Sequence, residues 1–262
     1  MPERTGYAQG TPCWVDVSSP DAPASTAFYA DVFGWEHRSG GEETGGYVTF
    51  MKGGKSVAGL MPQMNPGQPI VWNTYLCADD ADEVAANATE EGGQIVVEPM
   101  DVLDLGRMGF LVDPTGAFVG FWQPGTMRGA ELVNETGTVG WNELATRDAG
   151  AAADFYEAVF GMQAAESDPA MGGPVDYRLW TVNGNTVGGL LPMGDRFPEE
   201  IPPHWMTYFV VEDTDATVAQ AKAAGGGNPV APFDSGVGRM AVLTDPFEAH
   251  FSVIVPHVPP AG

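Results

Sequence analysis

The sequence predicts an α+β fold made of four modules, each with a strand and a helix followed by three further strands. The first observation behind this prediction is a repeat at a spacing of 127 residues, in which the segment 13–34 returns as 140–161. The second is that the repeat continues toward the end of each half, because 106–114 returns as 238–246. The third is that each half holds two strand–helix units of its own. Internal repeats decide the fold before any single motif does, and these predict curved mixed sheets that enclose cavities.

The two helices of the first half have recognisable faces and ends. The first carries Phe28, Val32 and Phe33 on one face and stops at a glycine. The second begins at Asp79 or Asp80, either of which can cap it, and stops at a pair of glycines. The elements predicted in the first half are a strand over 14–17, a helix over 21–33, strands over 47–51, 56–61 and 70–76, a helix over 80–91, and strands over 95–98, 108–112 and 117–122.

The repeat divides the chain into two domains, 1–127 and 128–262. The join falls in a polar, glycine-bearing stretch from Pro124 to Thr138. The pattern leaves open which modules pair to enclose each cavity, within one half or across the two.

Composition excludes several classes of partner. The 262 residues include 11 Lys and Arg against 35 Asp and Glu, which gives a net charge of -24. Such an acidic protein repels phosphate backbones and anionic lipids, so we expect neither nucleic acid nor membrane as a partner. No apolar run approaches the roughly 20 residues of a membrane span, and the first ten residues lack a signal-peptide pattern. We expect a cytoplasmic monomer or homodimer whose two cysteines form no disulfide framework.

The helix that ends at Gly34 and the Asp-Pro turn at 113–114 resemble the vicinal oxygen chelate superfamily, which includes glyoxalase I, extradiol dioxygenases and bleomycin-resistance proteins. The resemblance covers about 13–124 and about 140–256. The segment 134–144 is similar to the duplicated, two-domain actinobacterial proteins of the glyoxalase or hydroxylase type. The resemblance implies two glyoxalase/bleomycin-resistance-like domains. It does not settle the function, because the superfamily hosts isomerases, lyases, oxygenases and drug binders.

Metal enzymes of the superfamily take ligands from an opening strand, 14 residues before the helical Phe-Tyr, and from a Glu on a closing strand. The positions that correspond to these ligands in the present sequence are Trp14, Trp72, Trp141 and Trp205 on opening strands, and Gly59, Gly120, Gly189 and Ser252 on closing strands. An indole nitrogen is a donor only and glycine has no side chain, whereas zinc, nickel or iron needs several converging N, O or S donors. We therefore expect no metal ion and no cofactor.

The four tryptophans Trp14, Trp72, Trp141 and Trp205 are candidate ligand-binding residues. If they face a cavity, they can stack on a flat or partly apolar ligand. The same inward-facing positions also fit a second interpretation, in which the indoles fill the cavities as core.

Two carboxylates follow the same alternation. Asp16 and Glu143 come two residues after Trp14 and Trp141, so each should share a face with its indole. An inward carboxylate needs a partner. It can contact a cationic or hydroxyl-bearing ligand, or act as a general base, or form a salt bridge with Arg107 or Arg239.

The remaining candidate is His250. It lies two residues before Ser252 on the last predicted strand, so it should share the cavity face. Histidine titrates near neutral pH, which makes His250, with Glu143 or Asp16, the first choice for a catalytic acid or base. Its partner in the repeat is Phe118, which favours a packing role instead.

Two functions remain open. One is a metal-independent small-molecule-binding protein of the glyoxalase/bleomycin-resistance type, with an aromatic or cationic ligand and a role in resistance or secondary metabolism. The other is a glyoxalase-like lyase or isomerase, a hydroxylase, or another metal-free acid/base enzyme. Glutathione-dependent chemistry fits poorly, because glutathione is anionic and the chain has few Lys or Arg to bind it.

Overall fold

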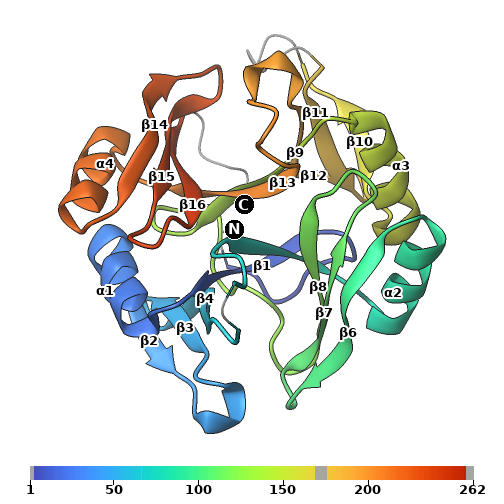
Figure 1. The fold of residues 1–262 in the computed structure, drawn as a ribbon, viewed down its shortest axis with the longest axis horizontal. Coiled ribbons are helices and arrows are strands. Elements are labelled where there is room, and N and C mark those ends of the chain that lie inside the picture. Colours follow the sequence, from blue (N-terminus) through green and yellow to red (C-terminus); the bar gives the residue numbers. More distant parts are fainter. Residues whose placement is uncertain (1–2, 66, 169–175, 258–262) are drawn as a thin grey trace.

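A computed structural model describes residues 3–65, 67–168 and 176–257 of the chain (Figure 1). Within these residues, sixteen strands form two eight-stranded mixed sheets, and four helices accompany them. The α+β fold and the four-module organisation are thereby confirmed. None of the helices in these ranges is long and apolar enough to cross a membrane.

The first half contains β1 (Pro12–Ser19), α1 (Ala22–Phe33), β2 (Glu36–Ser39), β3 (Val48–Lys52), β4 (Lys55–Pro62), β5 (Trp72–Cys77), α2 (Ala81–Glu90), β6 (Gln94–Val102), β7 (Gly106–Val112) and β8 (Phe118–Pro124). The second contains β9 (Val139–Thr146), α3 (Ala149–Phe160), β10 (Gln163–Glu166), β11 (Arg178–Val182), β12 (Asn185–Pro192), β13 (His204–Val210), α4 (Thr214–Ala223), β14 (Gly227–Asp234), β15 (Gly238–Thr244) and β16 (His250–Pro256). Short 3-10 helices lie at Glu42–Thr44 and Gly194–Arg196.

Each sheet comes from one half of the chain. The first has the strand order β2-β3-β4-β1-β5-β8-β7-β6, and the second repeats it as β10-β11-β12-β9-β13-β16-β15-β14. The opening strands β1 and β5 meet antiparallel at the centre of the first sheet, and each is flanked by its own module's closing strand in parallel. This arrangement brings the opening and closing strands of both modules side by side.

Local sequence explains where the helices begin and end. Asp21 accepts a hydrogen bond from the backbone N of Ala24, 3.0 Å away, and so caps α1. Gly34 adopts the left-handed conformation at its end, with φ of 68°. Asp80 caps α2 and is one of the two residues, with Asp79, that the sequence predicts for this role.

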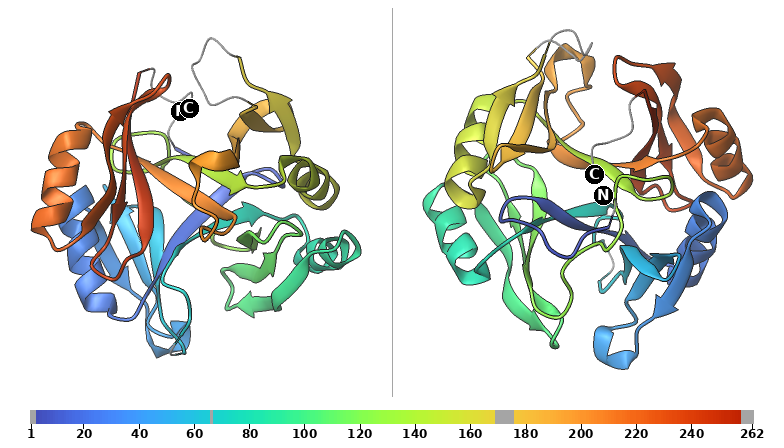
Figure 2. Two further views of the ribbon diagram at one scale, coloured as in Figure 1. Left: turned by 45° about the horizontal axis from the view of Figure 1, so that its top comes forward. Right: turned by 180° about the vertical axis from the view of Figure 1, so that it is seen from behind.

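The helices pack across the two halves. α1 lies beside α4, and α2 beside α3, in all the views of Figures 1 and 2. One core joins Phe28 of α1 to Val218 of α4 and Phe251 of β16, and a second joins Val84 of α2 to Phe155 of α3. Each half thus supplies one sheet, whereas each of these cores takes residues from both halves.

Two glycines permit this close approach. A Cβ on Gly93 would lie 2.9 Å from the ring of Phe155, and one on Gly226 would lie 2.8 Å from the ring of Phe28. Both distances are shorter than carbon atoms tolerate. The glycines that follow α2 and α4 therefore leave room for a phenylalanine from the opposite half.

Each sheet has a helix side and an opposite face, which we call the inner face. On β1, Val15 and Val17 join the core under the helices, whereas Trp14 and Asp16 alternate to the inner face. On β9, Leu144 lies in the core and Trp141 and Glu143 lie on the inner face. The strand alternation inferred from the sequence therefore places each indole and carboxylate on one face.

Candidate functional site

The Asp16 carboxylate is held by three side chains on the inner face of the first sheet. Its Oδ2 accepts hydrogen bonds from the hydroxyls of Tyr47, at 3.0 Å, and Tyr75, at 2.9 Å. Its Oδ1 accepts from Nδ2 of Asn73 at 2.8 Å. The indole Nε1 of Trp14 donates to the Tyr47 hydroxyl at 2.8 Å, which extends the network. Asp16 is only 1% exposed, so these donors replace water.

The second sheet repeats the network around Glu143. Oε2 of this carboxylate accepts from the hydroxyl of Tyr177 at 2.7 Å, and Oε1 from that of Tyr208 at 2.8 Å. Nε1 of Trp141 donates to the Tyr177 hydroxyl at 3.1 Å. Both halves therefore hold a buried carboxylate between two tyrosines, one of which also accepts from a tryptophan.

Glycines on the closing strands make room for these tyrosines. Gly59 of β4 pairs with Asp16, and Gly189 of β12 pairs with Glu143. A Cβ on Gly59 would collide with the Tyr47 hydroxyl, and one on Gly189 would collide with that of Tyr177. The space above each glycine is thus filled by a phenol that reaches the neighbouring carboxylate.

Burial governs the protonation of both networks. Burial raises the pKa of the Asp16 and Glu143 carboxyl groups, and the hydrogen bonds from their partners oppose that rise. Burial also raises the pKa of the four phenols well above the usual value. The tyrosines are therefore neutral hydrogen-bond donors at physiological pH, and a protein donor serves each carboxylate oxygen.

The residues present do not fit the metal centre that the superfamily's metalloenzymes use. The positions that hold metal ligands in those enzymes carry Trp14, Gly59 and Gly120 in the first sheet of this protein. Asp16 lies beside them, and its carboxylate already accepts hydrogen bonds from two phenols and an amide. Among the residues that the structure describes, no group of three or more His, Cys, Asp or Glu side chains is placed to hold a metal ion. The donor set is one of neutral hydrogen-bond donors rather than metal ligands.

The structure corrects the expected placement of Trp72 and Trp205. Trp72 pairs with Val17 on the helix side, where its Nε1 donates to the hydroxyl of Tyr29 at 3.0 Å. Trp205 makes the same contact with Tyr156 at 2.9 Å. Both are core residues and lie on the opposite face from Trp14 and Trp141.

The difference arises because the residue of β5 that is equivalent to Trp14 lies one position after Trp72. Counting back seven residues from the helix caps Asp21 and Asp80 gives Trp14 and Asn73, not Trp72. The same count in the second half gives Trp141 and Met206. A shift of one residue along a strand turns a side chain to the other face, so the second module of each half presents Asn73 or Met206 at the inner position.

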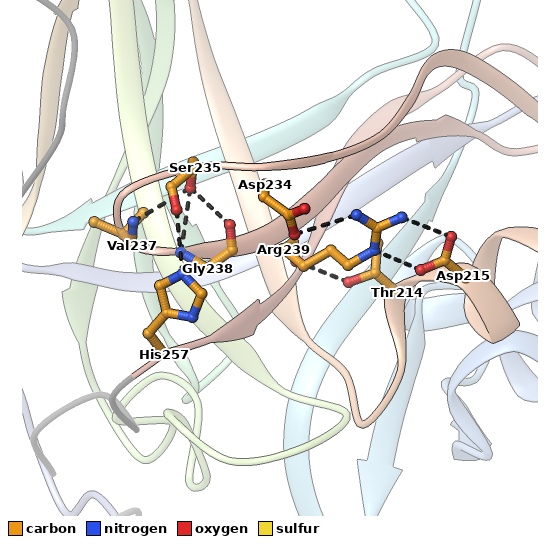
Figure 3. Close-up of polar contacts among 8 residues, drawn as sticks. All are labelled: Thr214, Asp215, Asp234, Ser235, Val237, Gly238, Arg239 and His257. Carbon is orange, nitrogen blue, oxygen red and sulfur yellow. Dashed lines mark hydrogen bonds and ion pairs between the residues drawn. The ribbon is translucent and has the colours of Figure 1, made fainter.

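The alternative salt bridges to Arg107 and Arg239 do not form. Arg107 pairs with Asp82 and Asp101 instead. Arg239 pairs with Asp215 and Asp234 at the end of the β14–β15 hairpin (Figure 3).

His250 does not join the Glu143 network. It shares the face of Ser252, as strand alternation predicts, but it is the first residue of β16 and its side chain is exposed. Its Nδ1 lies 2.9 Å from the backbone O of Glu248. Nothing in this geometry couples the His250 imidazole to Glu143 or Asp16.

The sequence reasoning missed the tyrosines and Asn73. The sequence repeat could have identified two of the tyrosines, because Tyr75 and Tyr208 are the last residues of the repeated segments 72–75 and 205–208. Tyr47 and Tyr177 lie in less similar stretches, and only the sheet pairing brings them above Gly59 and Gly189.

The two networks differ in their surroundings. Trp14 and Tyr75 belong to a packed cluster with Phe110 and Trp122, and Trp14 is 5% exposed. The corresponding residues beside Trp141 include smaller side chains, because 110 and 122 correspond to Val242 and Ile254 in the repeat. Tyr177, Tyr208 and Trp141 remain half-buried rather than buried.

A cavity of about 630 Å³ opens beside Trp141. Its walls come from the N-terminal segment before β1, the connection between the halves, the start of β9 and the β11–β12 hairpin. The residues that line it are Arg4, Gly6, Tyr7, Ala8, Thr11, Pro12, Val133, Asn134, Val139, Gly140, Trp141, Asn142, Val182, Asn183, Gly184, Asn185, Thr186 and Val187.

Comparison with known proteins agrees with the repeat. The family model described as Glyoxalase/Bleomycin resistance protein/Dioxygenase superfamily matches residues 13–121 and again 133–253. The chain belongs to this superfamily. The first match lies within the range 13–124 of the sequence resemblance, and the second overlaps the range 140–256 but begins earlier, at residue 133. The assignment of the superfamily is confirmed.

Relatives within the superfamily align with nearly the whole chain. CFP32 of Mycobacterium tuberculosis, which carries a provisional glyoxylase name, is 44% identical and covers 98% of each chain. The anthracycline biosynthesis protein DnrV of Streptomyces peucetius is 39% identical over 95% of this chain and 94% of its own. A Mn(II)-bound glyoxalase from Novosphingobium aromaticivorans shares the fold, with a TM-score of 0.64 at 15% identity over 95% of this chain and 82% of its own.

Proposed function

We propose that the protein binds an aromatic small molecule beside Trp141, in the second half of the chain, without a metal ion. The observation that carries this proposal is that Trp141 lines the cavity of about 630 Å³ while its indole is hydrogen-bonded through Tyr177 to Glu143. Pockets of roughly 300–1,000 Å³ are typical of small-molecule sites. The ring is thus fixed in orientation at the edge of a space large enough for a ligand.

Two features favour an aromatic ligand. Trp141 and Tyr7 both line the cavity, and aromatic rings contribute contact area and stacking geometry that a flat ligand can use. DnrV and DauV, which are 39% and 38% identical to this chain, are named for the biosynthesis of anthracyclines, which are polycyclic aromatic compounds.

The first half is the less suitable site. Its equivalent indole, Trp14, lies in a packed cluster with Phe110 and Trp122. A ligand there would have to displace core side chains, whereas beside Trp141 it enters existing space. We infer that the Asp16 network is part of the core, whereas the Glu143 network lies beside a cavity that can hold a ligand.

The chemistry of the inner faces supports binding without a metal ion. A metal ion needs several converging N, O or S donors, and the equivalent positions carry tryptophan, glycine, Asn73, Met206 and Ser252. The phenols of Tyr47 and Tyr177 occupy the space beside them. Elemental analysis of the purified protein should therefore find less than stoichiometric Zn, Ni, Mn or Fe, and about one ion per half would contradict the proposal.

The binding test uses the neutral probe 2-naphthol. Its titration should quench tryptophan fluorescence in the wild type and in Trp14→Phe, whereas Trp141→Phe should lose most of the quenching. Calorimetry should show an affinity about twofold to tenfold weaker for Trp141→Phe, the range expected for a weakened aromatic contact. Equal quenching and affinity in both variants would place the ligand elsewhere.

A metal-free acid/base enzyme is the second candidate, favoured by the position of Glu143 between two phenols. The raised pKa of this carboxyl brings it closer to the range in which it can exchange a proton with a substrate. The Glu143→Gln variant separates the two functions. If Glu143 is a catalytic group, this variant should still bind the ligand but no longer convert it. If the wild-type protein releases a bound compound chemically unchanged, binding is the function.

A further inference from the structure

Glu143 and Asp16, the two carboxylates that the sequence offered for a cationic ligand, do not line the cavity beside Trp141. No Asp or Glu is among the residues that line it within the described part of the chain. This is unexpected in a protein with 35 acidic residues. The acidic residues nearby along the chain have other partners, because Glu3 pairs with Lys55 at 3.1 Å and Glu131 accepts from Ser56 at 2.8 Å.

Arg4 is the one charged residue among the described residues that line the cavity. Its backbone N donates to the backbone O of Glu131 at 2.9 Å, which fixes this segment against the connection between the halves. Within the ranges that the structure describes, its half-buried guanidinium forms no ion pair or hydrogen bond. A guanidinium offers five donors in a planar fork and suits carboxylates well.

Asn142 is also among the residues that line the cavity, but its side chain lies on the opposite face of β9 from Trp141, the face that Leu144 presents to the core. Its Oδ1 accepts hydrogen bonds from Thr74, at 3.1 Å, and from Thr207, at 3.2 Å. These two hydroxyls fix the orientation of the amide. The first half has Val15 at this position in the repeat, and Val15 belongs to the core. The Asn142 amide is therefore held by core hydroxyls, and Arg4 supplies the donors for a ligand beside Trp141.

We propose that the ligand of this cavity is an aromatic compound that carries a carboxylate or another acceptor-rich group, rather than a cation. This inference rests on the proposed function and names its ligand class. The ring stacks on Trp141, and the acceptor oxygens accept hydrogen bonds from the guanidinium of Arg4. The net charge of -24 opposes an anion at long range, but at about 0.15 M salt charges beyond roughly 8 Å are screened. The local guanidinium therefore decides the selectivity.

The experiment compares two probes with the same ring and opposite charge, 2-naphthoate and 2-naphthylmethylammonium, by calorimetry at about 0.15 M salt. We expect 2-naphthoate to bind about tenfold or more tightly. Arg4→Gln should remove about tenfold of its affinity, as a lost charge-assisted contact does. Arg38→Gln is the matched control, because it changes the net charge equally at an exposed position on β2 and should leave the affinity unchanged.

2-Naphthol carries the same ring without a charge, so Arg4→Gln should weaken its binding far less than that of 2-naphthoate. Tighter binding of the ammonium probe, or equal effects of Arg4→Gln and Arg38→Gln, would overturn the inference while leaving the proposed function intact if 2-naphthol still binds beside Trp141. If neither charged probe nor 2-naphthol binds, both proposals fail.

Discussion

The hydroxyl of Tyr29 donates a hydrogen bond to Oδ2 of Asp245, 3.1 Å away, and so joins the first helix of the chain to the Asp-Pro turn that precedes its last strand. The repeat makes the same bond a second time, from Tyr156 to Asp113 at 3.0 Å. Both tyrosines are fully buried. The Tyr29 hydroxyl also accepts the indole N–H of Trp72, so the contact belongs to the core that the two halves share.

Removing this hydroxyl should weaken the link between the halves. Tyr29→Phe leaves the buried carboxylate of Asp245 without one donor, which should lower the free energy of unfolding by about 1–3 kcal/mol. Urea unfolding provides the measurement. A double-mutant cycle with Asp245→Asn isolates the pair, and a coupling energy near zero would show that the hydrogen bond does not stabilise the fold.

The shared cores also predict how the two halves behave when they are separated. Residues 1–127 contain a complete sheet, but α1 and α2 would expose faces that α4 and α3 normally cover. We expect each half alone to aggregate, to dimerise through these faces, or to lack a cooperative unfolding transition. Equimolar mixing during refolding should recover the circular dichroism and sedimentation of the whole chain. A monomeric half with a sharp thermal transition would make each half an independent domain.

Stability should depend on pH through Glu143. An unfolded Glu has a pKa near about 4.3, and burial raises that of Glu143 in the folded protein. Between these two values the folded state binds more protons than the unfolded state, so the free energy of unfolding falls as pH rises through that window. The penalty is absent below the unfolded pKa and complete above the folded one.

The comparison with Glu143→Gln isolates this contribution. As pH is lowered from about 7 to about 5, the wild type should gain stability relative to the variant, measured as the difference in urea midpoints. Glu90→Gln, a change at an exposed helix position, serves as the control for the overall loss of negative charge. A difference that stays constant with pH would show that Glu143 has the same proton affinity in both states.

The repeat was sufficient to predict the modules, the sheets and the face that Trp14 and Asp16 share, because strand alternation and helix caps are local properties. It was insufficient at Trp72, where the sequence similarity between modules is too weak to fix an alignment to one residue. In a strand, a shift of one residue moves a side chain from the inner face to the core. Asn73 therefore lies at the inner-face position where the indole of Trp72 was expected.

The partners of the carboxylates depend on contacts that a linear sequence does not show. Tyr47 lies 31 residues from Asp16 and Tyr75 lies 59 residues from it, and only the order of the strands brings them together. Arg107 was a chemically reasonable partner for Asp16, but Asp82 and Asp101 lie closer to it in the folded chain. The charge of a residue indicates what it can pair with, and the topology decides which pair forms.

The glycines beneath the tyrosines give a last prediction, which compares the two networks. A Cβ on Gly59 or Gly189 would collide with the phenol above it, so Gly59→Ala and Gly189→Ala should each lower the free energy of unfolding by about 1–3 kcal/mol. Gly150→Ala is the control, because that glycine lies in α3, where a Cβ would meet only Asp148 at 3.4 Å, and alanine favours the helix.

Ligand binding should respond to only one of these changes. A Cβ on Gly189 would also lie 2.9 Å from Nε1 of Trp141, so Gly189→Ala should shift the indole at the cavity and weaken 2-naphthol. Gly59→Ala perturbs the Asp16 network instead, and should lower stability while leaving the affinity for 2-naphthol unchanged. If Gly59→Ala weakened binding as much as Gly189→Ala, the ligand would have to contact the first half, and the cavity beside Trp141 would not be its site.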